Sequence, residues 1–290
     1  MTSLALELAP GLVFEFNELE PRLLEIVAAF LDFYPAARGR SDALVVSSSP
    51  SPLTRSARNR ADTLLEQDGL VVRRSGPVTL FESPDGVSAW CDSDRGIAGI
   101  ALKDPPEGAR EHFVWCALAS LLMELAEARG WFGLHAAGAV VAGRGLLLTG
   151  PSGVGKSTLV GRLDEAGHGV LSDDLIWLRQ RGDGFEMAPF PRDTIRSTAP
   201  LPTVGLADVV AIVCPTIADR GSSSLEPLPT TEVLSILVDQ SGFLGPASGT
   251  ARRFKALVRL ARSLPGYRLE AGRRQQEIPP LLANLSTTQP

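Results

Sequence analysis

The feature that most constrains this chain is a glycine-rich segment, Gly-Pro-Ser-Gly-Val-Gly-Lys-Ser-Thr, at residues 150–158. Its first eight residues fit the P-loop pattern G-x-x-x-x-G-K-[ST], in which glycines let successive backbone N–H groups point inward around a phosphate. An apolar strand is expected before the segment and a helix after it, so the positive end of the helix faces the anion. The segment therefore predicts a nucleotide cradle made of Gly150, Pro151, Ser152, Gly153, Val154, Gly155, Lys156, Ser157 and Thr158.

Two residues of this motif have expected roles of their own. Lys156 is expected to be an exposed, mobile cation that contacts the β- and γ-phosphates of ATP. Ser157 is expected to offer its hydroxyl to Mg²⁺. ATP and Mg²⁺ are thus the predicted cofactors.

The two apolar stretches before the motif are expected to form a β-hairpin. Residues 135–142 and 145–149 are separated only by Gly143-Arg144, whereas a parallel crossover needs a dozen or more residues. If Ala142 faces Gly145, the pairing places His135 abreast of Ser152, inside the motif. A single histidine beside an apolar strand is more often structural, but this register favours a functional role for His135.

An acidic pair, Asp173-Asp174, lies in a further predicted strand over residues 170–178. Such a pair is often only a turn or a helix cap. Asp173 follows Lys156 by 17 residues, which leaves room for one helix and a short loop, so the strand should return beside the P-loop strand with both carboxyl ends at one edge. Because neighbouring strand residues point to opposite faces, one carboxylate should face the metal and the other should accept the proton of a hydroxyl. We favour Asp173 for the metal and Asp174 for the proton, and the reverse assignment stays open.

Composition narrows the class of protein. The net charge of −5 over 290 residues shows no basic surface for a nucleic acid. Cys91, Cys116 and Cys214 have no metal or redox spacing and are interpreted as small buried thiols in a reducing compartment. The N-terminus lacks the basic start of a signal peptide and no uncharged apolar run reaches membrane-spanning length, so we expect a cytoplasmic protein without membrane contact.

The chain is expected to fold as an α/β protein of two domains. Residues 1–105 indicate a smaller α+β domain, with a helix at residues 21–32 and strands at 43–46, 70–73 and 78–81. Residues 106–290 indicate a P-loop domain on a mixed sheet. It is expected to hold helices at residues 110–129, 231–239 and 250–263 and strands at 208–214 and 267–270.

Several motifs together resemble those of the HPr kinase/phosphorylase family, and more closely those of its HprK-related relatives in bacterial biosynthetic clusters. They are Leu134-His135-Ala136-Ala137, the hairpin, residues 150–158, Gly167-His168 and Leu171-Ser172-Asp173-Asp174. The resemblance covers about residues 130–192 with specific motifs, and the chain to about residue 270 more loosely. It implies a core shared with the phosphoenolpyruvate carboxykinases, Mg²⁺, and phosphoryl transfer to a serine hydroxyl.

The resemblance also implies roles for particular residues. Lys156 and Ser157 would bind phosphate and metal, while His135, Asp173 and Asp174 would supply metal contact and the catalytic base. The E-I-R-G and P-G-R-N segments of the true HPr enzymes have no counterpart here. Arginine should stabilise charge on the transferring group. Arg192 is the candidate, with Arg196, Arg252 and Arg253 behind it.

The expected function is that of an ATP-dependent kinase acting on a hydroxyl, such as the serine of a biosynthetic precursor peptide. Free serine or another small metabolite is an alternative acceptor. A slow ATPase that acts as a nucleotide-dependent switch through a partner is an alternative of another class. The first domain could hold the acceptor or mediate assembly, and a homo-oligomer is compatible with the sequence.

Overall fold

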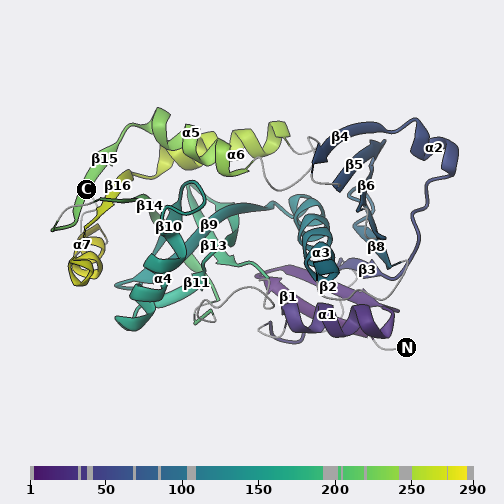
Figure 1. The fold of residues 1–290 in the computed structure, drawn as a ribbon, viewed down its shortest axis with the longest axis horizontal. Helices are drawn as coiled ribbons and strands as arrows, with labels where there is room; N and C mark the ends of the chain where they lie inside the picture. The colour runs from purple at the N-terminus through teal and green to yellow at the C-terminus, as the bar shows by residue number, and fades with distance from the viewer. Residues whose placement is uncertain are drawn as a thin grey trace. The chain divides into compact units, whose positions relative to one another are not determined.

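The computed structural model describes residues 3–31, 34–37, 42–67, 70–83, 86–102, 109–191, 202–203, 205–218, 221–241, 250–272 and 274–285. They form a mixed α/β protein of two compact units (Figure 1). The first is built mainly from residues up to Trp131 and the second mainly from Phe132 onward. No helix within the described ranges is long and apolar enough to cross a membrane.

Within its described residues, the first unit holds one mixed sheet in the order β1-β2-β3-β8-β7-β6-β5-β4. The β2–β3 and β3–β8 pairs are parallel and the others are antiparallel. Its elements are β1 (Ser3–Ala9), β2 (Leu12–Asn17), α1 (Pro21–Leu31), β3 (Leu44–Ser47), α2 (Arg55–Asn59), β4 (Asp62–Gln67), β5 (Leu70–Ser75), β6 (Val78–Glu82), β7 (Val87–Asp92), β8 (Ile97–Leu102) and α3 (Ala109–Glu127).

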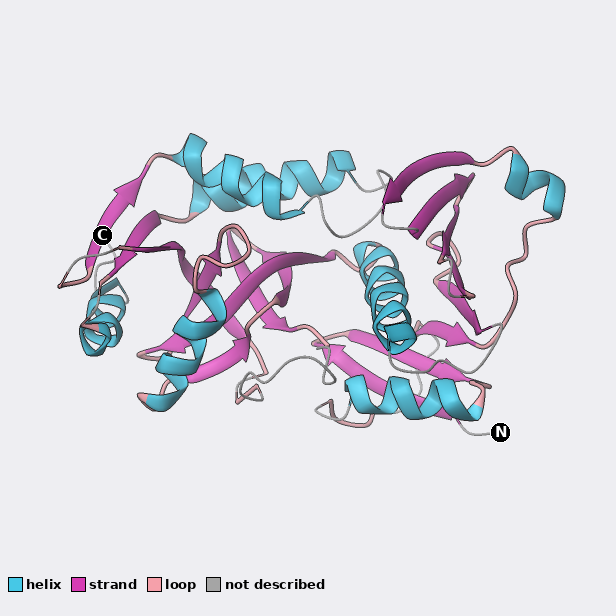
Figure 2. Cartoon of the chain, in the orientation of Figure 1, coloured by secondary structure: helices cyan, strands magenta, loops and turns pink. Residues whose placement is uncertain are grey.

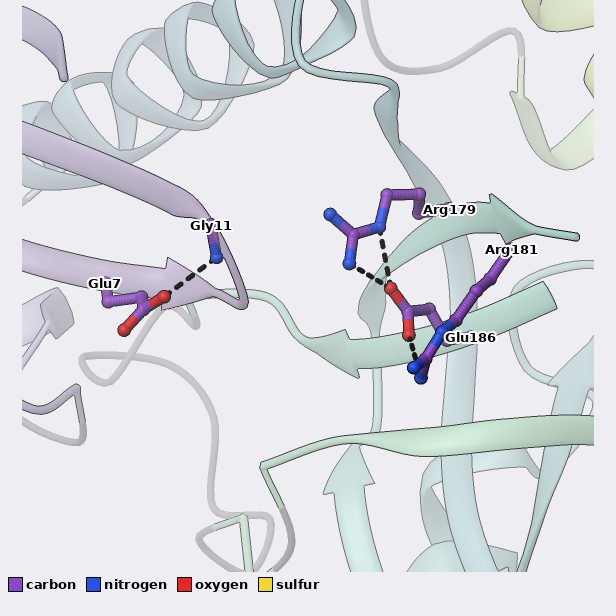
Figure 3. A network of polar contacts seen from close by, with 5 residues as sticks. All are labelled: Glu7, Gly11, Arg179, Arg181 and Glu186. Atoms are coloured by element: carbon purple, nitrogen blue, oxygen red, sulfur yellow. Dashed lines mark hydrogen bonds and ion pairs between the residues drawn. The ribbon is translucent and has the colours of Figure 1, made fainter. Parts of the chain in front are cut away.

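Helix α3 packs against β7 and β8 of this sheet. Its buried Glu124 accepts a hydrogen bond from Nη2 of Arg74 on β5 at 2.6 Å, so a charged pair ties the helix to the sheet. At the start of the chain, the Gly11 backbone N–H donates to Oε1 of Glu7 at 2.8 Å and closes the β1–β2 turn (Figure 3). These contacts lie within the first unit.

The second unit contains a mixed sheet in the order β10-β9-β12-β13-β14-β16-β15, in which β10 also pairs with β14 and β11 pairs with β9. Figure 2 shows its helices in cyan and its strands in magenta. Its elements are β9 (Trp131–Val141), β10 (Arg144–Thr149), α4 (Lys156–Glu165), β11 (Gly169–Ser172), β12 (Leu175–Arg181), β13 (Gly184–Pro189), β14 (Ala207–Ile217), β15 (Ser224–Leu228), α5 (Thr230–Ser241), α6 (Thr250–Ser263), β16 (Gly266–Ala271), η2 (Gln275–Glu277) and α7 (Ile278–Leu285).

Helices cover both faces of this sheet. The alternation of side chains along β10 sends Leu147 to a cluster with α5 and α6, and sends Leu146 and Leu148 to a second cluster with α4 and α7. These residues are completely buried. In Figure 1, α5 and α6 lie on one side of the strands of this unit and α4 on the other. The result is a helix–sheet–helix arrangement that fixes β10 and α4 in place.

Several expected elements are confirmed. Helices α1, α3, α5 and α6 and strands β3, β5, β6, β14 and β16 occupy the predicted parts of the chain. Strands β1, β2, β4, β7, β8 and β15 and helices α2 and α7 were not predicted. Cys91 and Cys214 are buried, as expected for these thiols, whereas Cys116 is only partly buried. Burial raises the pKa of Cys214 to about 12, with Glu232 adding to the shift and Arg268 opposing it.

The predicted hairpin register is wrong by two residues. The turn is Ala142-Gly143, both with positive φ (51° and 78°), and Val141 pairs with Arg144. A two-residue turn of this kind needs positive φ at both central positions, and both registers place one non-glycine residue there. The observed register puts Gly143 at the second position, the order typical of such turns, whereas the predicted register would have put Arg144 there. With the observed pairing, His135 lies abreast of Gly150, not Ser152.

The predicted strand over residues 170–178 is two strands, β11 and β12, separated by a bend at Asp173-Asp174. β11 and β10 both run antiparallel to β9 and therefore parallel to each other. Their carboxyl ends do meet at one edge, as predicted, but β9 lies between them. The prediction that β11 directly adjoins the P-loop strand is wrong.

The division of the chain also differs from the predicted boundary at residues 105 and 106. Helix α3 groups with the first unit, whereas the sequence analysis assigned it to the second. The physical reason is its packing on β7 and β8 and its ion pair with Arg74. The punctuation at residues 103–108, on which the predicted boundary rested, lies outside the described residues.

Candidate active site

The P-loop motif connects the carboxyl end of β10 to the start of α4, as the sequence predicts. Gly150, Gly153 and Gly155 have φ values of 144°, 82° and 99°, a region that other residues rarely enter. Gly155 caps α4, so Lys156 and Ser157 are its first two residues. The chain therefore turns sharply after the strand and presents the N–H groups of the first helical turn at the sheet edge.

Lys156 is buried, with only 6% of its surface exposed, which corrects the expectation of an exposed cation. Its Nζ donates to the backbone oxygens of Gly150 at 2.7 Å and Pro151 at 3.1 Å. Burial lowers the pKa of Lys156 below its usual value, and the charge of Asp174 opposes that shift. The motif thus folds back on its own lysine, whose ammonium is also in the field of an acidic side chain.

The acidic pair lies in the bend between β11 and β12, so strand alternation does not orient the two carboxylates. The backbone oxygen of Asp173 accepts a hydrogen bond from Oγ of Ser157 at 3.4 Å. The carboxylate of Asp174 lies 3.1 Å from Nε2 of His135, and its side chain is 65% exposed. The structure brings both residues to the P-loop motif, with Asp174 as the one that acts on both Lys156 and His135.

His135 is held from both sides. Its Nε2 faces Asp174, and its Nδ1 lies 2.8 Å from Oε1 of Gln240 near the end of α5. The side chain is 19% exposed, and both ring nitrogens face polar groups, so the ring does not point into the apolar core. Nε2 can donate its proton to the carboxylate of Asp174. Nδ1 can donate to the amide oxygen of Gln240 or, if that amide is turned over, accept from its NH2 group.

Gln240 is a residue that the sequence analysis missed. It is only 6% exposed, which is unusual for an amide side chain. It follows Leu237 by three residues and Val233 by seven, and these three are the buried residues of α5. A glutamine at a core position of an amphipathic helix was a usable signal, because a buried amide needs a hydrogen-bond partner.

The structure describes two of the four candidate arginines. Arg192 and Arg196 lie outside the described residues. Arg252 and Arg253 lie in the first turn of α6. The assignment of an arginine to the transferring phosphate therefore stays a prediction.

The oxygen-rich donor set suits Mg²⁺. No group of three or more His, Cys, Asp and Glu side chains gathers as a metal centre within the described ranges. Mg²⁺ does not need one, because it keeps several waters and binds one or two carboxylates together with substrate phosphates. The hydroxyl of Ser157 and the carboxylates of Asp173 and Asp174 are ligands of that kind.

Fold and site together define a mixed α/β protein that carries a strand, a P-loop motif and a helix, with an acidic bend and a histidine at the same sheet edge. No family model matches the chain. It is 38% identical over 71 residues to the HPr kinase/phosphorylase of Chlorobium limicola, covering 24% of this chain and 22% of that protein. It is 37% identical over 71 residues to the HPr kinase/phosphorylase of Chlorobium luteolum, covering 24% of this chain and 21% of that protein.

The similarity to HPr kinase/phosphorylases confirms the resemblance indicated by the motifs. The chain spans about a fifth of the length of the curated relatives it matches. Among solved structures, the HPr(Ser) kinase/phosphatase of Coxiella burnetii matches with a TM-score of 0.31 and 14% identity, over 53% of this chain and 96% of that chain.

Proposed function

We propose that this chain is a Mg·ATP-dependent kinase that transfers the γ-phosphate to a hydroxyl, with serine of a peptide or protein as the acceptor. The observation that carries the proposal is the carboxylate of Asp174, which is held by His135 and acts on the P-loop lysine. A nucleotide-dependent switch needs the phosphate cradle, but it needs no positioned carboxylate for an acceptor alcohol. The similarity to HPr kinase/phosphorylases supports the same reaction class.

Lys156 would exchange its contacts with the backbone oxygens of Gly150 and Pro151 for contacts with phosphate oxygens. Asp174 would accept the proton of the acceptor hydroxyl as that oxygen bonds to the γ-phosphorus. The bond from the γ-phosphorus to the bridging oxygen breaks, and ADP leaves with the electron pair. Mg²⁺ bound through Ser157 and Asp173 would neutralise charge on the phosphates.

His135 would act as a positioning residue within this scheme. Its contact with Asp174 fixes one oxygen of the carboxylate, and Gln240 fixes the ring. Because a general base must lie within hydrogen-bond reach of the proton it takes, a fixed carboxylate raises the fraction of productive encounters.

The acceptor follows less directly from the residues. The relatives are named for HPr, so HPr is one acceptor to test, and a precursor peptide of a biosynthetic cluster is the other protein-class candidate. Free serine is the small-molecule alternative. The chain covers only about a fifth of the length of those relatives, so HPr is a candidate acceptor that the experiment has to test.

The test measures transfer of the labelled γ-phosphate from ATP to three kinds of acceptor. These are HPr, serine-containing peptides encoded beside the gene for this chain, and free serine. We expect one phosphate on a serine of a peptide or protein, with formation of one ADP per phosphate transferred. Lys156→Ala is the control that removes the cradle cation. ATP hydrolysis that never yields a phosphorylated acceptor, and that rises with a binding partner, would favour the switch instead.

A further inference from the structure

A small cavity of about 120 Å³ opens beside the P-loop motif, on the side away from His135 in the strand order. Its walls come from the motif and α4, from the ends of β14 and β16, and from the start of α7. The lining residues that matter here are Val154, Thr158, Arg162, Ile217, Ala271 and Ile278. β14 runs parallel to β10, and β16 runs parallel to β14, so the carboxyl ends of all three strands lie at this edge.

The cavity is mostly apolar, and one of its walls is an exposed side chain. Ile217 is 75% exposed, which sets it apart because large apolar side chains are usually covered. A side-chain carbon placed on Gly155 would lie 3.9 Å from Ile217, so the isoleucine borders the motif itself. Thr158 and Arg162 supply the polar side chains among the lining residues.

We infer that this cavity receives the nucleobase of the nucleotide whose phosphates lie on the P-loop motif. The inference rests on the proposed function. Its size argues for a part of the ligand, because a whole drug-sized ligand occupies about 300–1,000 Å³. A flat aromatic base fits between Ile217 and the wall formed by Ala271 and Ile278, and the guanidinium of Arg162 can lie against its face. Thr158, in the first turn of α4, belongs to the phosphate cradle and also lines the cavity, so its hydroxyl can bond the ribose.

The apolar lining has a consequence for nucleotide choice. A site discriminates strongly between ligands when it offers buried hydrogen-bonding groups, and weakly when it offers apolar contact. Among the lining residues, Thr158 and Arg162 are the ones with side chains able to form such bonds. GTP is therefore expected to bind within about tenfold of ATP, whereas tripolyphosphate, which lacks a base, binds more weakly than either.

The experiment measures the Kd of Mg·ATP and of Mg·tripolyphosphate for the full chain by calorimetry. Ile217→Ser removes the exposed wall and Ala271→Leu fills the cavity. Each is expected to weaken ATP binding about tenfold and to change tripolyphosphate binding by less than about twofold. Phe254→Ser is the matched control, because Phe254 is also an exposed apolar residue, at 48%, and does not line the cavity.

The outcomes separate the two proposals. Equal weakening of both ligands, or unchanged ATP binding in both variants, overturns the base site and leaves the cradle standing. Wild-type protein that binds ATP no more tightly than tripolyphosphate does the same. Wild-type protein that binds neither ligand overturns the cradle and the base site together.

Discussion

Two carboxylates of the second unit, Asp174 and Glu186, sit in opposite settings. Glu186 on β13 is 1% exposed and faces Arg179 across the β12–β13 pair. Its Oε1 accepts from Nε of Arg179 at 2.6 Å, and Nη1 of Arg181 lies 3.3 Å from Oε2 (Figure 3). Asp174, in the bend before β12, is 65% exposed and has its contact with His135 on one oxygen.

The difference separates a structural carboxylate from one suited to chemistry. Two guanidinium groups satisfy both oxygens of Glu186, and a buried charge so paired holds two strands together. Asp174 keeps access to solvent and lies in the field of Lys156, so it can take a proton or contact a metal. Charge pairing alone therefore does not mark a functional site, and exposure at the sheet edge is what distinguishes this one.

The largest effect is expected from Asp174→Asn. Loss of a general base lowers turnover by about 10²–10⁴-fold, while Mg·ATP affinity changes by less than about threefold. Asp173→Asn should instead weaken the metal-dependent part of nucleotide binding. Turnover and calorimetry check both variants. The reverse pattern would swap the two roles, and normal phosphorylation by both variants would remove the kinase proposal.

Glu186→Gln should do the opposite of Asp174→Asn. Breaking the buried pair is expected to lower the free energy of unfolding by about 1–3 kcal/mol, with turnover per folded molecule unchanged. Urea denaturation measures the first quantity and an activity assay the second. Arg181→Gln is the matched control. Its side chain is 69% exposed, so its loss should cost less than about 1 kcal/mol.

Lys156→Ala should weaken Mg·ATP binding about tenfold to a hundredfold, because charge-assisted hydrogen bonds contribute about 1.5–3 kcal/mol each. Burial of this side chain among backbone oxygens means that a small loss of stability is expected beside the loss of affinity. Calorimetry and thermal melting measure the two. Wild-type affinity in a variant that melts normally would refute the phosphate cradle.

His135→Ala should lower turnover at least about tenfold, or about 1.4 kcal/mol, without changing ATP affinity. If His135 acts through Asp174, the double variant with Asp174→Asn should be no slower than Asp174→Asn alone. Gln240→Leu should give a smaller loss of the same kind, because it frees the ring without removing it. Additive losses in the double variant would show that His135 acts independently of Asp174.

The smallest effect concerns pH. Because burial lowers the pKa of Lys156, its charge is lost at a lower pH than that of an ordinary lysine near 10.5. Nucleotide affinity should fall as pH rises through that window. The unfolded chain binds more protons there than the folded one, so the free energy of unfolding should rise over the same range. Lys156→Met should abolish both trends, which calorimetry and denaturation at alkaline pH would show.

The parts of this protein that depend on residues close together in the sequence could be predicted from the sequence. Glycines at three motif positions, followed by Lys156 and Ser157, specify a turn into a helix through local backbone sterics alone. The hairpin before it and the shared edge of β10 and β11 follow from short connections along the chain. Neither needs a partner that is far away in sequence.

Tertiary structure decided the rest. The pattern of apolar residues did not reveal the hairpin register, because registers that differ by two residues keep the same side chains on the same face. The bend at Asp173-Asp174 interrupts a stretch whose composition suits one strand. Gln240 reaches His135 across 105 positions of sequence, and α3 joins the first unit through its packing on β7 and β8. These contacts join residues that are far apart in the sequence, so they form only when the whole sheet and its covering helices pack together.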